Sequence, residues 1–192
     1  MKKRILAVIM AAVILCLAFT ACSGNKVTDS NAPDSQNKDN PGVFGAFESV
    51  DMEGNKVDFT ALQGKKLTMV NVWATFCAPC IREMPDLEKI SKDYADKGFQ
   101  IVGIPLDVTL NADGTYGNDG TFSDAEKVIE QTGVTYLNIL MSESLINSPA
   151  GEIYTVPSTY FLDENGNQIG EVYVGSKSYS DWCSIIDSLL AE

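Results

Sequence analysis

Histidine is absent from all 192 residues of the sequence. Histidine is the side chain that most often serves as a general base near neutral pH, and it activates serine or cysteine in many hydrolases. Its absence excludes Ser/His and Cys/His nucleophilic catalysis, together with metal hydrolysis at a histidine-ligated site. The chemistry of this chain must come from other side chains.

Basic residues are also scarce, because 14 Lys and Arg stand against 26 Asp and Glu, for a formal net charge of −12. Nucleic acid binding needs Lys and Arg to neutralise phosphates, and electrostatic binding to anionic lipid needs a basic cluster. The charge balance argues against both. We interpret the acidic surface as a solvated coat that favours solubility, and we expect no nucleic-acid partner.

Only five cysteines are present, and they fall into different contexts. Cys16 lies in an apolar N-terminal run, Cys22 ends that run, Cys77 and Cys80 form a C-x-x-C pair, and Cys183 stands alone. A secreted disulfide scaffold needs several cysteine pairs, so the count excludes it. We expect Cys183, which lies on a C-terminal helical pattern, to be buried as a small apolar residue.

A C-x-x-C pair indicates redox chemistry, zinc or covalent haem. Zinc usually takes four ligands, typically from a second such pair or from histidines, and the sequence contains neither. Haem attachment requires histidine directly after the second cysteine, where this chain has Ile81. The Asp/Gly/Asn-rich stretch 106–122 fails the spacing of a calcium-binding EF-hand loop. We therefore predict redox chemistry with no metal and no cofactor, and a solvated surface loop at 106–122.

The N-terminus has the pattern of an export signal, since residues 2–4 are basic and the next 17, residues 5–21, carry no charge. Residues 19–22, Phe-Thr-Ala-Cys, resemble the lipobox of bacterial lipoproteins, in which cleavage precedes the cysteine and lipid is attached to it. We predict a signal peptide at 1–21 and lipidation of Cys22. The run is just long enough to span a bilayer, so an uncleaved anchor remains an alternative, as does a plain secreted form.

The rest of the chain divides into two parts. Residues 22–43 are almost all polar, small, Pro or Gly and cannot bury enough apolar surface to fold. We predict a disordered, lipid-attached tether there, with a reach of roughly 25 Å. Residues 44–192 have the size of one domain, and we expect the protein to be a monomer.

The pattern of this domain alternates between strands and helices. A run of β-forming apolar residues at 67–73 predicts a buried strand, and helical spacing follows it with Pro85 inside. Ser123 and Glu126 form a capping box that would open a further helix. The expected elements are a hairpin at 47–59, strands at 67–73, 99–104 and 135–140, helices at 81–98, 123–132 and 179–190, and a hairpin of 160–162 with 169–174. This order predicts an α/β domain with a mixed central sheet flanked by helices.

The cysteine pair would lie where a strand ends and a helix begins. Unpaired backbone N–H groups and the positive end of the helix dipole favour a thiolate at that point. We expect Cys77 to be an exposed nucleophile and Cys80, one turn later, to resolve the mixed disulfide that Cys77 forms. An inert structural disulfide is the alternative.

Two segments carry a family resemblance. Residues 71–85, Asn-Val-Trp-Ala-Thr-Phe-Cys-Ala-Pro-Cys-Ile-Arg-Glu-Met-Pro, resemble the active-site segment of the thioredoxin superfamily and, more narrowly, of the TlpA/ResA-like membrane-tethered thioredoxins and their redoxin relatives. Residues 155–161, Thr-Val-Pro-Ser-Thr-Tyr-Phe, are similar to the cis-proline segment of that family. The resemblance covers about residues 44–190. It implies a thioredoxin-like fold with an N-terminal β-hairpin extension.

The resemblance also implies roles for individual residues. Cys77 would attack and Cys80 would resolve. Pro157 would be cis and lie beside the pair, which leaves the backbone of Val156 able to pair with an extended substrate segment. Glu83 matches an acidic residue that ResA-like members keep, which could accept the proton of Cys80 or separate the pKa values of the pair. The alternative for Glu83 is a solvated helix glutamate.

The sequence departs from the family pattern at two positions. Asn71 stands where cytoplasmic thioredoxins have a buried acid, which makes a role for Glu83 more attractive. Phe76 stands where tryptophan commonly precedes the first cysteine, and this difference concerns substrate contacts more than the chemistry. Trp73 is expected in the core.

The predicted activity is that of an extracytoplasmic thiol-disulfide oxidoreductase, lipid-anchored at the cell membrane. It would reduce disulfides of exported proteins and be reduced again by a membrane electron donor of the thiol-transfer type. The client stays open between apocytochrome c, methionine sulfoxide reductase and other proteins. Alternatives are a disulfide-forming oxidant, since direction depends on reduction potential, and a lipid-anchored binding protein. A redoxin-type peroxidase is a further alternative, although Ala74 occupies the position of its usual threonine.

Overall fold

The computed structural model describes residues 41–116 and 121–191. The predicted signal peptide at 1–21, the lipidation site Cys22 and most of the predicted tether lie outside the described residues. Within these two ranges, no helix is long and apolar enough to cross a membrane.

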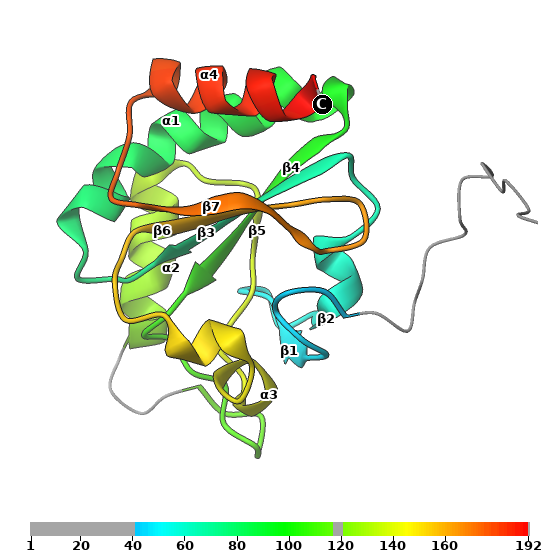
Figure 1. Ribbon diagram of the computed structural model, residues 1–192. Helices are drawn as coiled ribbons and strands as arrows, with labels where there is room; N and C mark the ends of the chain where they lie inside the picture. Colours follow the sequence, from blue (N-terminus) through cyan, green and yellow to red (C-terminus); the bar gives the residue numbers. More distant parts are fainter. Residues whose placement is uncertain (1–40, 117–120, 192) are drawn as a thin grey trace, which may run out of the picture. The chain divides into compact units, whose positions relative to one another are not determined.

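A mixed sheet of five strands forms the centre of the domain, in the order β5-β4-β3-β6-β7 (Figure 1). The strands are β3 (Leu67–Trp73), β4 (Phe99–Pro105), β5 (Leu137–Asn138), β6 (Ser158–Leu162) and β7 (Gln168–Val174). β3, β4 and β5 are parallel, whereas β6 and β7 are antiparallel to their neighbours. All seven residues of β3 are buried, as its continuous apolar run predicts for a strand covered on both faces. The predicted mixed sheet is confirmed.

The N-terminal hairpin is a separate two-stranded sheet of β1 (Glu48–Val50) and β2 (Lys56–Asp58). Its turn is closed by the carboxylate of Asp51, which accepts hydrogen bonds from the N–H groups of Glu53 and Asn55. The N–H of Leu140 donates to the carbonyl of Val50 and joins the hairpin to the segment after β5. The predicted hairpin extension is confirmed.

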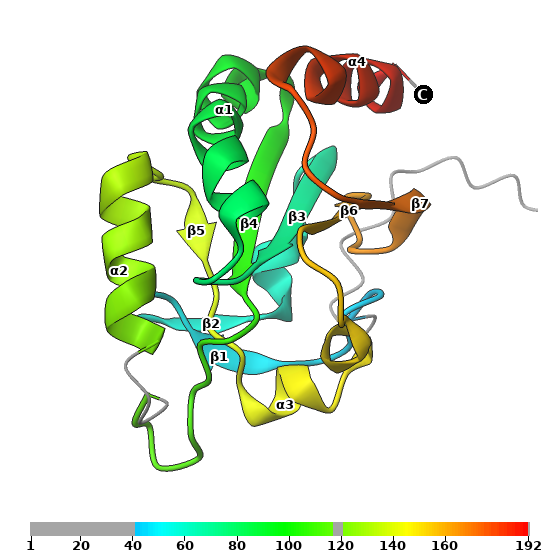
Figure 2. The ribbon, with the colours of Figure 1, turned by 90° about the vertical axis from the view of Figure 1, so that its left-hand side faces the viewer.

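Side chains of β3 alternate between two apolar layers. Leu67 and Met69 pack under α1 (Ala78–Tyr94) and α4 (Tyr179–Leu190), which lie side by side on one face of the sheet (Figures 1 and 2). Val70 and Val72 point to the other face, where they meet Phe44 and residues of α3 (Glu143–Ile146). α2 (Thr121–Thr132) packs beside α1 through Ala125 and Val128. The sheet therefore has helices on both faces and holds the start of α1 at the end of β3.

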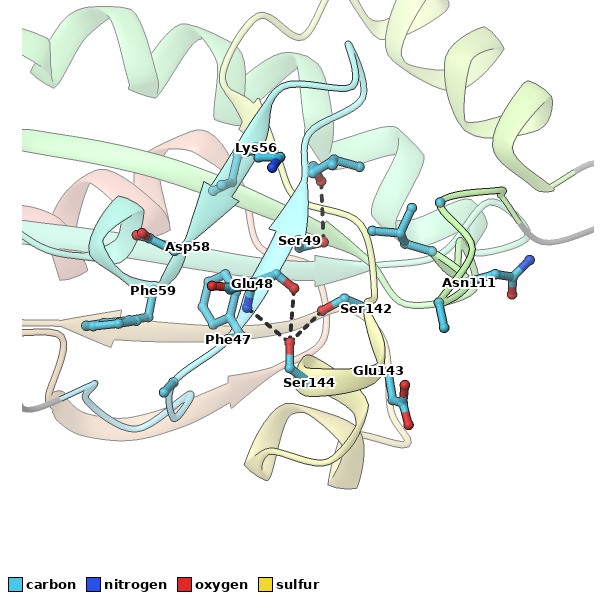
Figure 3. Close-up of a pocket in the computed structure, with 16 residues that line it drawn as sticks. Phe47, Glu48, Ser49, Lys56, Asp58, Phe59, Asn111, Ser142, Glu143 and Ser144 are labelled. Carbon is cyan, nitrogen blue, oxygen red and sulfur yellow. Dashed lines mark hydrogen bonds between the residues drawn. The ribbon is translucent and has the colours of Figure 1, made fainter.

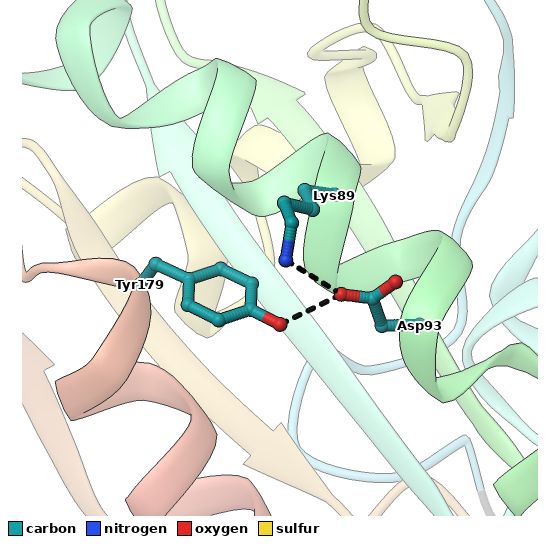
Figure 4. Close-up of polar contacts among 3 residues, drawn as sticks. All are labelled: Lys89, Asp93 and Tyr179. Atoms are coloured by element: carbon teal, nitrogen blue, oxygen red, sulfur yellow. Dashed lines mark hydrogen bonds and ion pairs between the residues drawn. The ribbon is translucent and has the colours of Figure 1, made fainter.

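Helices α1 and α4 are joined at their solvent side by a polar cluster of Lys89, Asp93 and Tyr179 (Figure 4). The Tyr179 hydroxyl donates to Asp93 at 2.6 Å, and the Lys89 ammonium lies 2.9 Å from the same carboxylate oxygen. Beneath this cluster, Trp182 and Ile186 of α4 are fully buried. These buried apolar side chains therefore hold the helix pair against the sheet.

Several boundaries differ from the sequence-based expectation. α2 begins at Thr121, so Ser123 lies inside its first turn and is not the predicted capping residue. β5 has only two residues where a strand over 135–140 was predicted. The one-turn helix α3 and the 3-10 helix Pro149–Glu152 were not predicted, although Ser142 and Ser148 cap them. Elements of one turn or two residues are too short to show a hydrophobic period.

Candidate active site

Cys77 is the N-cap residue of α1. Its N–H donates to the carbonyl of Ala74 at 3.0 Å, and its sulfur accepts the N–H of Cys80 at 3.3 Å. Cys77 and Cys80 are joined by a disulfide. The sulfur of Cys77 therefore lies at the positive end of the helix, where unpaired N–H groups stabilise negative charge. The predicted position at the end of a strand and the start of a helix is confirmed.

The pair is more deeply buried than predicted. Cys77 is 6% exposed and Cys80 is not exposed at all, so the expectation of an exposed Cys77 is wrong for this disulfide form. The cause is packing, because both cysteines belong to an apolar cluster with Trp73 and Met84. Of the two cysteines, only Cys77 has any exposed surface in the disulfide form.

The segment before β6 lies beside the pair. The Val156–Pro157 peptide bond is cis, which confirms the prediction for Pro157. The Val156 side chain packs against the cluster that contains both cysteines. The carbonyl of Pro157 accepts the N–H of Gly175 at 2.9 Å and fixes this segment to the end of β7. Within the described part of the chain, the backbone of Val156 has no hydrogen-bond partner.

Glu83 lies one turn after Cys80 on α1 and is only 3% exposed. Its carboxylate accepts the backbone N–H of Lys177 at 3.1 Å, the side-chain amide of Asn71 at 3.2 Å and the indole N–H of Trp182 at 3.4 Å. The alternative of a solvated helix glutamate is therefore wrong. Burial raises the pKa of Glu83, and the three hydrogen bonds only partly offset that effect.

Asn71 connects this carboxylate to the sheet. Its amide nitrogen donates to Glu83 and also to the hydroxyl of Thr159 on β6 at 3.2 Å. Asn71 is fully buried on β3. Where cytoplasmic thioredoxins have a buried acid, this chain therefore has an amide that donates a hydrogen bond to Glu83. The acid–base role that the resemblance implies for Glu83 stays a prediction.

Sequence reasoning missed three contributors to the site. Trp182 and Lys177 reach Glu83 from the end of the chain, and neither spacing nor motif indicates that contact. Asp107 binds Thr75 next to the pair and lies in the stretch predicted to be a solvated loop. That prediction is wrong at the start of the loop, where Val108 is fully buried. A polar residue two positions after a parallel strand was the available signal for Asp107.

Other residues singled out from the sequence have simpler environments. Trp73 is fully buried and donates its indole N–H to Asn138 at 2.9 Å, as a core residue should. Cys183 is a free thiol and only half-buried, so the core prediction holds in part. Phe76 is 77% exposed next to the pair. Among the described residues, no group of three or more Cys, Asp or Glu side chains could hold a metal ion.

A groove of about 960 Å³ has no cysteine among its lining residues (Figure 3). Its walls come from the β1–β2 hairpin, the loop 110–114 and the start of α3. There the hydroxyl of Ser144 bridges the backbone N–H and carbonyl of Glu48. The groove is a feature of the hairpin and does not belong to the redox centre.

The family model for Redoxin matches residues 23–181. The chain belongs to the redoxin family. The thiol-disulfide oxidoreductase ResA of Oceanobacillus iheyensis is 29% identical over 180 residues, which cover 91% of this chain and 80% of that protein. The thioredoxin-like protein YneN of Bacillus subtilis is 32% identical over 133 residues, 68% of each chain. These relatives confirm the resemblance to ResA-like thioredoxins.

Similar solved structures confirm the fold. A thiol:disulfide interchange protein of the thioredoxin family from Chlorobium tepidum TLS has a TM-score of 0.59 and 26% identity, over 76% of this chain and 93% of that one. StoA from Bacillus subtilis has a TM-score of 0.56 at 19% identity, over 75% and 98% of the two chains. The predicted thioredoxin-like fold is confirmed, and the predicted enzyme class, thiol-disulfide oxidoreductase, is that of the ResA relatives.

Proposed function

We propose that this thiol-disulfide oxidoreductase reduces disulfides of exported proteins, with Cys77 as the attacking residue and Cys80 as the resolving residue. The observation that carries the proposal is the position of the Cys77 sulfur. It caps α1, accepts the N–H of Cys80 and belongs to the only one of the two cysteines that has surface.

The exchange needs no group besides the two thiols. The Cys77 thiolate attacks one sulfur of the client disulfide, that S–S bond breaks, and the departing client sulfur takes up a proton. Cys80 then loses its proton and attacks the Cys77 sulfur of the mixed disulfide. The second client thiol is released, two electrons have passed to the client, and the enzyme carries the Cys77–Cys80 disulfide seen here.

We propose that Glu83 accepts the proton that Cys80 loses before it attacks the mixed disulfide. The two residues are three apart on α1 and so face the same side of the helix. A carboxylate whose pKa is raised by burial is a better proton acceptor for a thiol than an ordinary glutamate. Asn71 and Trp182 orient this carboxylate through their hydrogen bonds.

The client would bind as an extended segment beside the cis-proline. The unpaired backbone of Val156 lies next to the cysteine cluster and offers a donor and an acceptor for strand-like pairing. This mode fixes the main chain of the client and leaves its sequence open. Protein thiols and disulfides are therefore the substrate class, and contacts elsewhere on the enzyme would select the individual client.

We place the enzyme at the extracytoplasmic face of the cell membrane, held by lipid on Cys22 after removal of residues 1–21. The tether 22–43 would then join the lipid to the domain at 44–192. A membrane electron donor of the thiol-transfer type would reduce the Cys77–Cys80 disulfide after each turnover. The support is the N-terminal sequence, in which a basic segment, an apolar run and a lipobox-like motif follow one another.

The environment of Thr75 argues against the peroxidase alternative. The hydroxyl of Thr75 donates to Asp107 and is thus already engaged, and Ala74 occupies the position of the threonine usual in redoxin peroxidases. The oxidant alternative concerns the direction of electron flow, which the reduction potential decides.

Trapping the mixed disulfide tests the residue roles. Cys80→Ser keeps the attacking thiol and removes the resolving one, so we expect client proteins to accumulate as disulfide adducts on non-reducing gels. Cys77→Ser should form no adduct and lose insulin reduction almost completely. Cys183→Ser removes the remaining cysteine of the domain and should keep full activity. Adducts that form on Cys77→Ser would contradict the assignment.

A glutathione titration of the wild-type pair tests the direction. We expect a reduction potential below about −220 mV, since thioredoxin-like reductants lie there and oxidants lie well above it. A value well above that limit would identify an oxidant, and a pair that does not exchange would support a binding protein.

A further inference from the structure

The active-site turn is tied to a neighbouring loop by one side chain. The N–H of Thr75 lies 3.1 Å from each carboxylate oxygen of Asp107, and its hydroxyl donates to one of them at 2.5 Å. Asp107 thus accepts both donors of a residue that stands two positions before Cys77. Both residues are half-buried, so water screens the contact only in part.

The sheet itself creates this contact. In the parallel pairing of β3 with β4, Trp73 lies opposite Pro105, the last residue of each strand. Thr75 and Asp107 are each two residues further on, and the N–H of Leu106 donates to the carbonyl of Trp73 at 2.7 Å between them. The contact therefore continues the strand register beyond the sheet into the loop that carries the cysteines.

Apolar packing also holds this loop, because Ala74 and Cys77 are both buried in the cluster that contains the cysteine pair. Residues 74–77 connect β3 to α1, and within them the Cys77 N–H donates to the carbonyl of Ala74. Phe76 is 77% exposed and gives no anchorage. In the oxidised enzyme the bond to Cys80 fixes Cys77 as well. After reduction that bond is gone, and the noncovalent contacts alone must keep the Cys77 sulfur at the end of α1.

We infer that Asp107 is a positioning residue, which holds the turn at Thr75 so that the reduced Cys77 stays at the N-cap of α1. This inference rests on the proposed role of Cys77 as attacking residue. Asp107 acts through Thr75 and does not touch the reacting sulfur. By ordering the dithiol form, it favours that form relative to the disulfide, and a stabilised dithiol has a less negative reduction potential.

Variants at Thr75 test the inference without changing charge. Thr75→Val removes the hydroxyl donor at nearly constant volume. We expect its rate of exchange with a small aromatic disulfide to be about tenfold lower than that of wild type. This factor corresponds to the low end of the free energy of a hydrogen bond to a charged group. The reduction potential of Thr75→Val should become more negative. Thr75→Ser restores the hydroxyl and should recover both values. A potential and a rate equal to wild type in Thr75→Val would overturn the inference.

Variants at Asp107 separate hydrogen bonding from charge. Asp107→Ala removes both, whereas Asp107→Asn removes the charge and one acceptor oxygen but keeps the other oxygen as an acceptor for Thr75. We expect Asp107→Ala to lose rate about as strongly as Thr75→Val, and Asp107→Asn to recover part of it. Equal losses in the two variants would show that the acceptor kept in Asp107→Asn contributes nothing, and would overturn a positioning role.

The chain contains a matched control in the exposed loop that follows. Thr115 donates its N–H at 3.0 Å and its hydroxyl at 2.7 Å to Asp113, so the same two donors meet a carboxylate, here within one exposed turn. Asp113→Ala should leave rate and potential unchanged, and an equal loss there would also overturn the inference. Wild-type protein without any exchange would refute the proposed function itself, whereas active wild type with equally active Thr75→Val and Asp107→Ala would refute only the role of Asp107.

Discussion

Glu83 is the residue whose observed environment differs most from what the sequence pattern alone suggests. Its position on a helix full of charged residues is compatible with simple solvation, yet its carboxylate is buried and accepts three hydrogen bonds. Glu88, five residues further along α1, is also buried, but its surroundings lower its pKa, whereas those of Glu83 raise it. The two carboxyl groups form a natural comparison.

The stability of a Glu83→Gln variant relative to wild type should rise with pH. Burial raises the pKa of Glu83 above its ordinary 4.5, so the native state binds more protons than the unfolded state between 4.5 and the raised value. Wild-type stability therefore falls as pH rises through that interval, and glutamine removes this fall. Urea unfolding of the oxidised protein at a series of pH values measures the difference.

Glu88→Gln supplies the control with the opposite sign. Burial alone would raise the pKa of Glu88, but hydrogen bonds from Lys92 and Thr135 outweigh it and hold the pKa below its ordinary value. Its contribution to stability is therefore present above pH 4.5 and lost as pH falls below. The relative stability of Glu88→Gln should decrease as pH rises, and parallel trends in both variants would contradict the assignment for Glu83.

Much of the site was predictable residue by residue, because its chemistry is local in the chain. Cys77 and Cys80 follow from one motif, and the cis bond at Pro157 follows from another. The partners of Glu83 did not follow, since Trp182 lies 99 residues away and only the packing of α4 brings it there. Contacts between distant segments have no signature in spacing.

At the scale of elements, prediction succeeded where a hydrophobic period was long enough. The bounds of β3 and α4 agree with the predicted 67–73 and 179–190. β5 and α3 are too short to have a period, and the register of the sheet, which sets the Thr75–Asp107 contact, is a property of paired strands. The fold class was therefore predictable and the loop geometry was not.

The contact between α1 and α4 should depend on its apolar layer. Ile186 is fully buried, so Ile186→Ala should lower the free energy of unfolding by about 2–5 kcal/mol through lost burial and a cavity. Asp93→Ala removes the polar cluster on the solvent side of the same contact (Figure 4) and should have a much smaller effect. Denaturant unfolding of both variants measures this, and a larger loss in Asp93→Ala would contradict it.

For the whole molecule, charge and anchoring are linked. Removal of residues 1–21 would take away three of the 14 basic residues and no acidic residue, which leaves 11 against 26 and a formal charge of −15. A domain this acidic gains nothing from anionic lipid. The membrane attachment proposed above would then depend on the N-terminus.

Cys22→Ala should therefore release the protein from the membrane. Without the cysteine there is no site for lipid, and we expect the protein to move from the detergent phase to the aqueous phase on detergent partition and to lose incorporation of labelled fatty acid. Cys16→Ala, a cysteine change inside the predicted signal peptide, is the matched control and should stay in the detergent phase. Retention of Cys22→Ala in the membrane would favour the uncleaved anchor.

The indole of Trp182, bonded to Glu83 and packed among aromatic rings, gives the enzyme an intrinsic optical reporter. The chain has only two tryptophans, and the second, Trp73, stands four residues before Cys77. We expect the emission of Trp182 to respond to the charge on Glu83, and the emission of Trp73, which lies in one apolar cluster with the cysteines, to respond to the disulfide, because disulfides quench fluorescence. Turnover can thus be followed in real time in unlabelled protein, with Trp73→Phe separating the two signals.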